Sequence, residues 1–281
     1  MKWKIGIIQN NNDILTENVL IIDTNIDIKF TNDYIKKDFG VADPFIYDKY
    51  IFAEAINENL LKIQINNGIK KNNQYKSTRH KGGIIVVGKL NKKKEIIFSD
   101  IISDKNFHLS YPLVFKYNNN SYMIPETYQA VELKLYKCIQ FPFKWEFEKK
   151  ILDGGYCDST LFKIKDYYYI FTRTVKPDLN MCETYLFRTK DILNENLILY
   201  KKNILPNGYR GGGNVFNMNN KLYIPIQPPS IPYGKNLIIY EIIYNNNDIS
   251  FKYNNKICIS DNFNGIHHIS NYNNTFICDY Y

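Results

Sequence analysis

The chain has 281 residues, of which 44 % are hydrophobic and 15 % aromatic, and its formal net charge is +8. A chain of this length can bury a large core within one domain, and no apolar run approaches the roughly 18 residues of a membrane-spanning helix. Five cysteines without a C-x-x-C pair argue against a disulfide framework or a zinc site and favour a reducing, cytoplasmic location. No basic stripe interleaved with aromatic residues stands out, so we assign the positive charge to solvated lysines and expect no nucleic-acid binding.

The chain begins with two short apolar runs, Lys4 to Ile8 and Val19 to Ile22. The first of these is too short for the apolar region of a secretory signal. Both runs precede the first of five repeats and belong to none of them, so we expect them to pair with strands elsewhere in the fold.

Five similar strands follow along the chain, each beginning with an aromatic residue and then Ile or Met. They begin at Tyr50, Tyr122, Tyr169, Tyr223 and Phe276, at intervals of 72, 47, 54 and 53 residues. Short alternating runs bounded by Asn, Gly, Asp and Lys surround them, and almost no segment has the apolar spacing of a surface helix. An all-β repeat of about 40–50 residues is typical of a propeller blade. The sequence therefore predicts an all-β fold, a five-bladed β-propeller.

Four strands are expected in each of the second, third and fourth repeats. In chain order they cover residues 112–115, 122–124, 133–136 and 145–147, then 160–162, 168–171, 185–187 and 197–200, then 214–216, 222–224, 237–240 and 249–251. The first repeat is longer because of residues 57–80, a polar stretch rich in Asn and Lys. We interpret 57–80 as a long loop or flap over the pocket, ahead of a strand at Ile84 to Val87.

The fifth repeat has only two strands, Ile266 to Ser270 and Phe276 to Cys278, before the chain ends. Two strands alone would leave an open edge and half of an apolar face exposed. We therefore expect Lys4 to Ile8 and Val19 to Ile22 to complete the last blade and close the ring, which makes residues 1–281 a single domain.

Polar residues recur at the same two places in the aligned repeats, before the first strand and at the end of the second. The first set is Asp43, Ser110-Tyr111, Asp158, Arg210 to Gly213 and His267-His268, and the second is Glu54, Glu126, Arg173 and Gln227. Because the first strands of a propeller surround its axis, we expect these side chains to meet in one pocket. A charge at such a place is costly unless it is solvated, paired or used.

Asp43, Glu126 and Asp158 are the candidate catalytic carboxylates. Glycosidic chemistry needs one carboxyl group to exchange a proton with the glycosidic oxygen and another to activate the attacking group or act as nucleophile. The structural alternative is that Asp43 and Asp158 only cap turns, as Asp before Pro or Ser commonly does. Their shared repeat position, with Glu126 on the neighbouring strand, favours the catalytic interpretation.

The remaining polar residues are candidates for substrate binding: His108, Tyr111, Arg173, Arg210, Gln227, His267, His268 and Glu54. Arg210 is followed by three glycines, which let a backbone approach a ligand closely, although a tight turn between blades would also select glycine. The histidines can bind sugar hydroxyls or a phosphate, or transfer a proton. No ligand spacing supports a metal site, and no cofactor is expected.

A resemblance to a known family rests on short motifs in the second and third repeats. They are His108 to Pro112, Tyr122 to Thr127, Leu135-Tyr136, Phe141-Pro142, Trp145 and Asp158 to Thr160. These motifs resemble the N-terminal domain of glucosamine inositolphosphorylceramide transferases and its stand-alone bacterial relatives. That domain is similar in turn to the five-bladed propeller glycosidases of family 43. In the plant-type transferases a separate domain carries the glycosyltransferase fold, and the resemblance does not extend to it.

The resemblance implies roles for the three carboxylates. In the propeller glycosidases an Asp of the first blade is the base, a later Asp tunes a pKa and a Glu is the general acid, which points to Asp43, Asp158 and Glu126 respectively. Here the Glu precedes the later Asp, lying in the second blade and not after the third.

Two functions follow as expectations. The first is a carbohydrate-active protein that transfers or cleaves a glycosyl group in surface-polysaccharide or glycolipid synthesis. The alternative is a non-catalytic glycan-binding or scaffold propeller. The expected partners are a sugar, a sugar phosphate or a nucleotide sugar, together with other polysaccharide-assembly enzymes.

Overall fold

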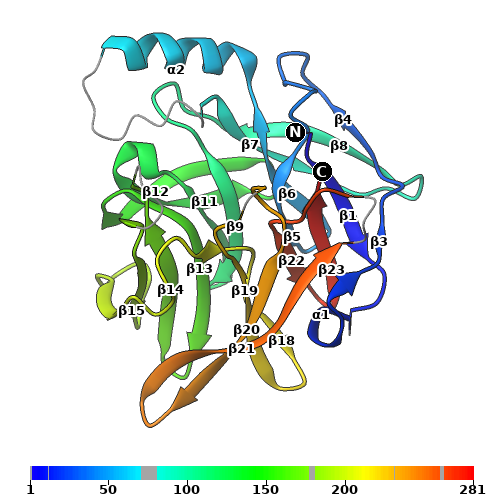
Figure 1. The fold of residues 1–281 in the computed structure, drawn as a ribbon. Helices are drawn as coiled ribbons and strands as arrows, with labels where there is room; N and C mark the ends of the chain where they lie inside the picture. Colours follow the sequence, from blue (N-terminus) through cyan, green and yellow to red (C-terminus); the bar gives the residue numbers. More distant parts are fainter. Residues whose placement is uncertain (1, 12, 71–80, 177–180, 231, 260–262) are drawn as a thin grey trace.

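Five β-sheets are arranged as the blades of a propeller in the computed structural model, which describes residues 2–11, 13–70, 81–176, 181–230, 232–259 and 263–281 (Figure 1). This confirms the predicted all-β, five-bladed fold. Blade one contains β5 (Ala42–Tyr47), β6 (Tyr50–Ile56), β7 (Gly83–Gly88) and β8 (Glu95–Ile102), with β4 (Asp27–Phe30) parallel to β8 at its edge. Blade two contains β9 (Ser110–Tyr117), β10 (Asn120–Glu126), β11 (Glu132–Gln140) and β12 (Lys144–Asp153), with the 3-10 turn η1 (Tyr128–Ala130) after β10.

The other three blades follow in the same order around the ring. Blade three contains β13 (Tyr156–Ile164), β14 (Tyr167–Thr174), β15 (Thr184–Thr189) and β16 (Ile198–Lys202). Blade four contains β17 (Arg210–Gly211) and β18 (Phe216–Met218), both paired with β19 (Lys221–Gln227), then β20 (Leu237–Asn245) and β21 (Asp248–Ile259). Blade five contains β22 (Ile269–Tyr272), β23 (Thr275–Tyr280), β1 (Lys4–Ile8) and β3 (Ile22–Asp23).

Strand β1 closes the ring, as predicted, by pairing antiparallel with β23 from Lys4 opposite Tyr280 to Ile7 opposite Ile277. The prediction for Val19 to Ile22 is only half right. Ile22 joins blade five through β3, but β2 (Val19–Leu20) runs parallel to the outer strand β21 of blade four.

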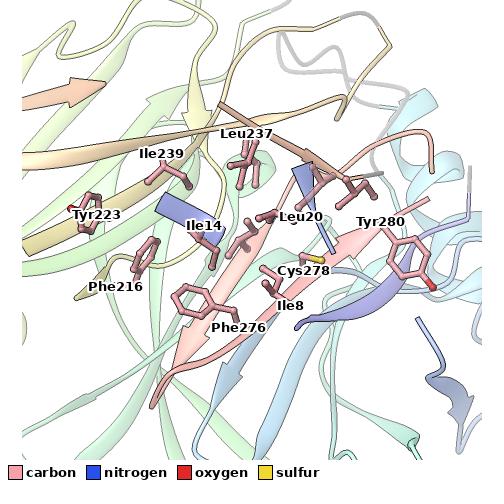
Figure 2. Close-up of a cluster of buried hydrophobic side chains, with 14 residues drawn as sticks. Ile8, Ile14, Leu20, Phe216, Tyr223, Leu237, Ile239, Phe276, Cys278 and Tyr280 are labelled. Carbon is pink, nitrogen blue, oxygen red and sulfur yellow. The ribbon is translucent and has the colours of Figure 1, made fainter. Parts of the chain in front are cut away.

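Burial explains why β2 lies where it does. Leu20 is fully buried beside Ile257 and Ile259 in the apolar cluster between blades four and five. The short helix α1 (Asp13–Thr16) adds Ile14 to the same cluster (Figure 2). The N-terminal segment therefore adds strands to two blades, four and five, and not only to blade five.

Pairs of asparagine form four of the tight turns between strands. Both residues of Asn118-Asn119, Asn219-Asn220, Asn246-Asn247 and Asn273-Asn274 have φ between 46° and 64°. Two-residue hairpin turns of this kind require positive φ at both central positions, and Asn tolerates that conformation better than most residues. The abundance of Asn therefore has a structural use in this fold.

The prediction that residues 57–80 form a loop is wrong for residues 58–70, which form helix α2 (Glu58–Lys70); residues 71–80 lie outside the described residues. The Asn57 side chain caps the helix, since Oδ1 accepts hydrogen bonds from the N–H groups of Asn59 and Leu60 at 3.0 and 3.1 Å. Gln64 is buried and donates to the carbonyl oxygens of Asp104 and Phe107. The polar composition of this segment gave no apolar pattern from which the helix could be predicted, because the helix docks through one buried Gln and few apolar contacts.

Within the described part of the chain, no helix has both the length and the apolar character needed to cross a bilayer.

Candidate functional site

The first strands of blades one, two and three share a backbone irregularity near their start. Asp43, Tyr111 and Asp158 have φ values of 49°, 47° and 50°, and the pairing with the second strand shifts register beside each of them. A left-handed conformation is uncommon for residues with large side chains, and bulges of this kind redirect a side chain. Each of the three side chains makes polar contacts with residues of other blades.

Asp43 of blade one lies against His267 and Asp279 of blade five. Asp43 Oδ1 is 3.4 Å from His267 Nε2, and Asp279 Oδ2 is 2.7 Å from His267 Nδ1. The latter contact is an ion pair by distance, although its N–H direction is not that of a hydrogen bond. The imidazole therefore lies between two carboxylates.

Asp279 is fully buried and organises the backbone around it. Its two oxygens accept hydrogen bonds from the N–H groups of Asp43, His267 and His268, at 3.0, 3.2 and 2.9 Å. Burial raises the pKa of Asp279, but the close positive charge of His267 outweighs it, so the pKa is lowered. For His267, burial lowers the pKa and Asp279 more than compensates, so the pKa is raised. Each member of this pair therefore favours the charged form of the other.

The pKa of Asp43 is raised to about 8. Burial is the largest cause, and the charges of Glu54, Asp279 and Asp158 add to it, while His267 opposes them. Asp43 is thus mostly protonated near neutral pH and becomes a carboxylate within reach of physiological conditions. Trp3 stacks on the His267 ring, with centroids 4.1 Å apart, and restricts its orientation.

His268 differs from His267 in the direction of its pKa shift. It is fully buried, it lies edge-on to Phe45 and Tyr111, and burial lowers its pKa to about 3. Its Nδ1 is 3.6 Å from Asp43 Oδ1, which is too long for a hydrogen bond. His268 is therefore a neutral ring packed beneath Asp43.

Asp158 of blade three pairs with Arg210 of blade four. Arg210 Nη1 lies 3.3 Å from Asp158 Oδ2, and its Nε donates to Gln227 Oε1 at 2.5 Å. Burial raises the pKa of Asp158, but Arg210 and Arg173 outweigh it, so the pKa is lowered. Asp158 is an ionised carboxylate at neutral pH.

Glu126 of blade two lies beside Asp158 and has the opposite protonation state. Burial raises the pKa of Glu126 well above its ordinary value, and the Asp158 charge adds to the effect against Arg210. A hydrogen bond from Glu126 contributes to the low pKa of Asp158. Glu126 is thus a neutral carboxylic acid that donates to an ionised aspartate, an arrangement suited to a general acid.

Several predicted ligand-binding residues have their polar atoms engaged with protein groups. Tyr111 is 1 % exposed, and its hydroxyl accepts from Gly213 N–H at 2.8 Å and lies 2.9 Å from Thr160 Oγ1. Arg173 donates to Cys157 Sγ at 3.2 Å and to the Gly208 carbonyl at 3.0 Å. Both residues therefore position the blades around the site.

His108 and Glu54 form a second buried pair between blades two and one. His108 Nδ1 accepts from Gly83 N–H at 3.0 Å, which places the ring proton on Nε2, 3.3 Å from Glu54 Oε1. The negative charge of Glu54 contributes to the raised pKa values of both Asp43 and Glu126.

The three glycines after Arg210 allow close packing between blades. A Cβ atom on Gly213 would lie 1.6 Å from the Ile269 carbonyl oxygen, and one on Gly211 would lie 2.4 Å from the Asp158 carbonyl oxygen. Of the two interpretations of these glycines, the tight contact between blades is the one that the geometry supports.

Among the residues that the structure describes, two groups of side chains have the composition of a metal site. Asp43, His267 and Asp279 offer ligand atoms within 4.8 Å of one another, as do Glu126, Cys157 and Asp158. In the second group, burial raises the pKa of the Cys157 thiol well above its ordinary value and Arg173 lies against the sulfur, so the group does not suit a thiolate-bound cation.

Sequence reasoning missed Asp279, Trp3 and Tyr233. Tyr233 lies under the Arg210 guanidinium, 4.9 Å from its carbon, and beside the His267 ring. Asp279 had a detectable signal, because it is the one charged residue in the strand Phe276 to Tyr280. The two aromatic residues had none, since their contacts join the N-terminus and a loop of blade four to blade five.

Fold and site together define a five-bladed β-propeller with a buried cluster of carboxylates and cations between its blades. Solved structures with this fold include an α-L-arabinanase of Cellvibrio cellulosa in complex with arabinohexaose, with a TM-score of 0.54 and 13 % identity over 76 % of this chain and 78 % of that one. An exo-β-1,3-galactanase of Phanerochaete chrysosporium is similar with a TM-score of 0.58 and 7 % identity, over 83 % of this chain and 53 % of that one. At these identities the likeness establishes the fold alone.

Sequence comparison gives the family. Residues 30–270 match the family model for the N-terminal region of glucosamine inositolphosphorylceramide transferase 1, and the chain belongs to this family. It is 27 % identical over 215 residues to the transferase of Oryza sativa subsp. indica, and 27 % identical over 226 residues to that of Arabidopsis thaliana. These matches cover 72 % and 76 % of this chain but 26 % of each relative, so the chain spans about a quarter of the length of these relatives.

Proposed function

We propose that this protein is carbohydrate-active and uses Asp43, Glu126 and Asp158, which we call the axial carboxylates, to transfer or cleave a glycosyl group in surface-polysaccharide or glycolipid synthesis. The observation that carries the proposal is the pairing of a neutral Glu126 with an ionised Asp158, next to Asp43 with a pKa of about 8. An acid and a base with separated pKa values are what glycosidic chemistry requires. Membership of a family named for a glycosyl-transfer activity agrees with it.

The proposed roles follow from the protonation states. Glu126 gives its proton to the glycosidic oxygen as the bond to the sugar carbon breaks, and Asp43, once ionised, takes the proton of the attacking hydroxyl. Asp158 keeps the Glu126 proton in place through their hydrogen bond. The proton gained by Asp43 balances the one lost by Glu126. One turnover therefore leaves Asp43 protonated and Glu126 ionised, and proton exchange with solvent restores the starting protonation states.

The cations beside the carboxylates favour a negatively charged donor. Arg210 is a fork-shaped donor whose side chain keeps 16 % of its surface exposed, and it lies over the Tyr233 ring. A sugar phosphate or nucleotide sugar would place its phosphate near Arg210 and its base or sugar ring near the aromatic residue.

A ligand screen and one isosteric variant test the proposal. Thermal unfolding is measured with sugar nucleotides, sugar phosphates and neutral oligosaccharides, since a ligand that binds the folded state raises the midpoint. Turnover of each stabilising compound is then followed for the wild type, for Asp43→Asn and for Asp166→Asn, an exposed turn residue, as the matched control. Loss of turnover in Asp43→Asn alone is expected. Equal turnover in all three proteins contradicts the proposed base.

A second candidate function, glycan binding without catalysis, is favoured by one observation. Asp43, Glu126 and Asp158 are 9 %, 8 % and 4 % exposed and already have protein partners. A binding propeller would keep ligand stabilisation in Asp43→Asn and show no turnover in the wild type, so the same experiment separates the two functions.

A further inference from the structure

A cavity of about 530 Å³ lies between the hairpins of blades one and two. None of the residues of the axial site, the cluster around Asp43, Glu126 and Asp158, lines it. We call it the outer hollow. The residues that matter in its wall are Tyr50, Lys89, Leu90, Lys92, Ile97 and Phe143. Aromatic, aliphatic and lysine side chains thus border one concave surface.

The strand directions place the outer hollow at the far end of the blades from the axial carboxylates. Strand β5 begins beside Asp43 and ends at Tyr47, and β6 returns from Tyr50 to Glu54, so Tyr50 marks the end opposite Asp43. Residues 89–94 join β7 to β8 at that same end, because Gly88 pairs with Ile51. The hollow and the axial site are therefore separated by the length of a strand.

Large apolar side chains are unusually exposed at this hollow. Phe143 is 55 % exposed and Ile97 is 50 % exposed. Phe141, at 37 %, links them to the interior, because its ring is 5.4 Å from that of Tyr50 and 6.2 Å from that of Phe52. A contiguous apolar surface anchored to the core but open to solvent marks an interaction site.

The rim of the hollow is positively charged. Segments 47–50, 88–97 and 141–144 contain six lysines and two acidic residues. One of the acids, Glu95, is already paired with Lys29, and one of the lysines, Lys94, with Asp23. Lys89, Lys92, Lys93 and Lys144 are exposed and form no ion pair with any residue in the described ranges. The rim thus presents unneutralised cations around apolar side chains.

We propose that the outer hollow is a docking surface for an anionic phospholipid bilayer. Phe143 and Ile97 enter the interface between headgroups and acyl chains, and the rim lysines contact lipid phosphates. Exposed aromatic side chains and clustered lysines are the two features that bind proteins to anionic membranes reversibly. A bilayer seated there leaves the axial site, at the other end of the blades, open to water-soluble ligands.

Co-sedimentation with lipid vesicles tests the proposal. The protein is mixed with vesicles of phosphatidylcholine alone, or of phosphatidylcholine and phosphatidylglycerol, at low and at high salt. The expected result is binding to the mixed vesicles at low salt, at least tenfold weaker binding to the neutral ones, and release by salt. Failure of the wild type to bind the mixed vesicles overturns the proposal.

Matched variants separate the hollow from general surface charge. Phe143→Ser, and Lys89→Glu with Lys92→Glu, should each lower the bound fraction at least fivefold. The controls are Phe147→Ser, which removes a ring that is 54 % exposed but lies outside the hollow, and Lys252→Glu with Lys256→Glu on β21. Equal loss in variants and controls would show adsorption through net charge and would refute the assignment.

Thermal unfolding of each variant confirms that it is folded. Stabilisation by the ligand found in the sugar screen reports on the axial site independently, so a negative vesicle result leaves the proposed function untouched, and the converse also holds.

Discussion

Asp43 and Asp158 occupy the same position in blades one and three, yet their environments shift their pKa values in opposite directions. Both are buried, both have a φ close to 50°, and both lie beside a bulge in the first strand. Asp158 faces Arg210 and keeps a low pKa, whereas Asp43 faces His267 and a surplus of carboxylates, and its pKa rises to about 8. The repeat fixes where the carboxyl group lies, and the neighbouring blade fixes whether it is ionised.

This difference matters because it supplies an acid and a base within one cluster. Repetition alone would give two equivalent aspartates with equal affinity for a proton. Arg210 and Gln227 enter from blade four, which follows blade three, and His267 and Asp279 enter from blade five, which precedes blade one around the ring. Each Asp is therefore tuned by residues of an adjacent blade.

The largest expected effect is on turnover. Glu126→Gln keeps the shape and a hydrogen-bond donor to Asp158 but has no proton to give. We expect turnover of the identified glycosyl donor to fall by about 10²- to 10⁴-fold while ligand stabilisation remains. Initial rates measure the first quantity and thermal shifts the second, with Glu148→Gln on the exposed face of β12 as control. Retention of full activity would remove Glu126 from the acid role.

The next effect tests the ion pair of Asp158. Arg210→Met leaves the buried carboxylate without its nearest cation, and we expect a loss of about 3 kcal/mol in the free energy of unfolding. Combining it with Asp158→Asn should restore much of that loss, since no buried charge then lacks a partner. Urea denaturation of the single and double variants gives the coupling energy. Strictly additive losses would mean that Arg210 does not set the charge of Asp158.

The third prediction concerns the dependence of stability on pH. The folded-state pKa of Asp43, about 8, lies above its ordinary value of 3.8, so the unfolded chain releases this proton first. The contribution of Asp43 to stability is therefore present in full below pH 4 and is lost as the pH rises to about 8. Asp43→Asn should flatten the curve in this window by a few kcal/mol.

The quantity to compare is the difference in the free energy of unfolding between the wild type and Asp43→Asn at each pH. Glu126 and His267 titrate in both proteins, so their contributions cancel in this difference. If the difference does not change between pH 4 and pH 8, Asp43 has an ordinary pKa and the contrast with Asp158 disappears.

The smallest effect concerns Tyr111, the uncharged residue at the same position in blade two. Tyr111→Phe leaves the buried Gly213 N–H without its partner at 2.8 Å, and we expect a loss of about 1–3 kcal/mol in stability with no change in the Asp43 pH dependence. Urea denaturation at two pH values measures both. A loss of ligand stabilisation in a variant of unchanged stability would instead return Tyr111 to the role of a ligand-binding residue.

Local pattern was sufficient for most of the fold. Alternating apolar residues and turn residues predict the strands, and the spacing of five Tyr/Phe-Ile/Met copies predicts five blades and closure by Lys4 to Ile8. The same reasoning failed at α2, where a buried Gln64 replaces an apolar stripe, and at β2, where Leu20 buries against blade four. Both failures concern segments whose position is decided by a contact with a distant part of the chain.

In the axial site too, the residues set by local pattern could be predicted and those set by contacts with distant segments could not. Asp43 and Asp158 could be picked out because repeat alignment superposes them, and Glu126 because it ends the second strand of its repeat, as Glu54 does. Asp279 was detectable only as the one charged residue of its strand, and no spacing connected Trp3 to the site. Sequence by itself determined the number of blades and which polar residues begin and end their inner strands, because backbone pairing depends on local alternation. Only the tertiary structure decided which of those residues are charged, because a pKa in a buried cluster depends on neighbours that the chain brings in from other blades.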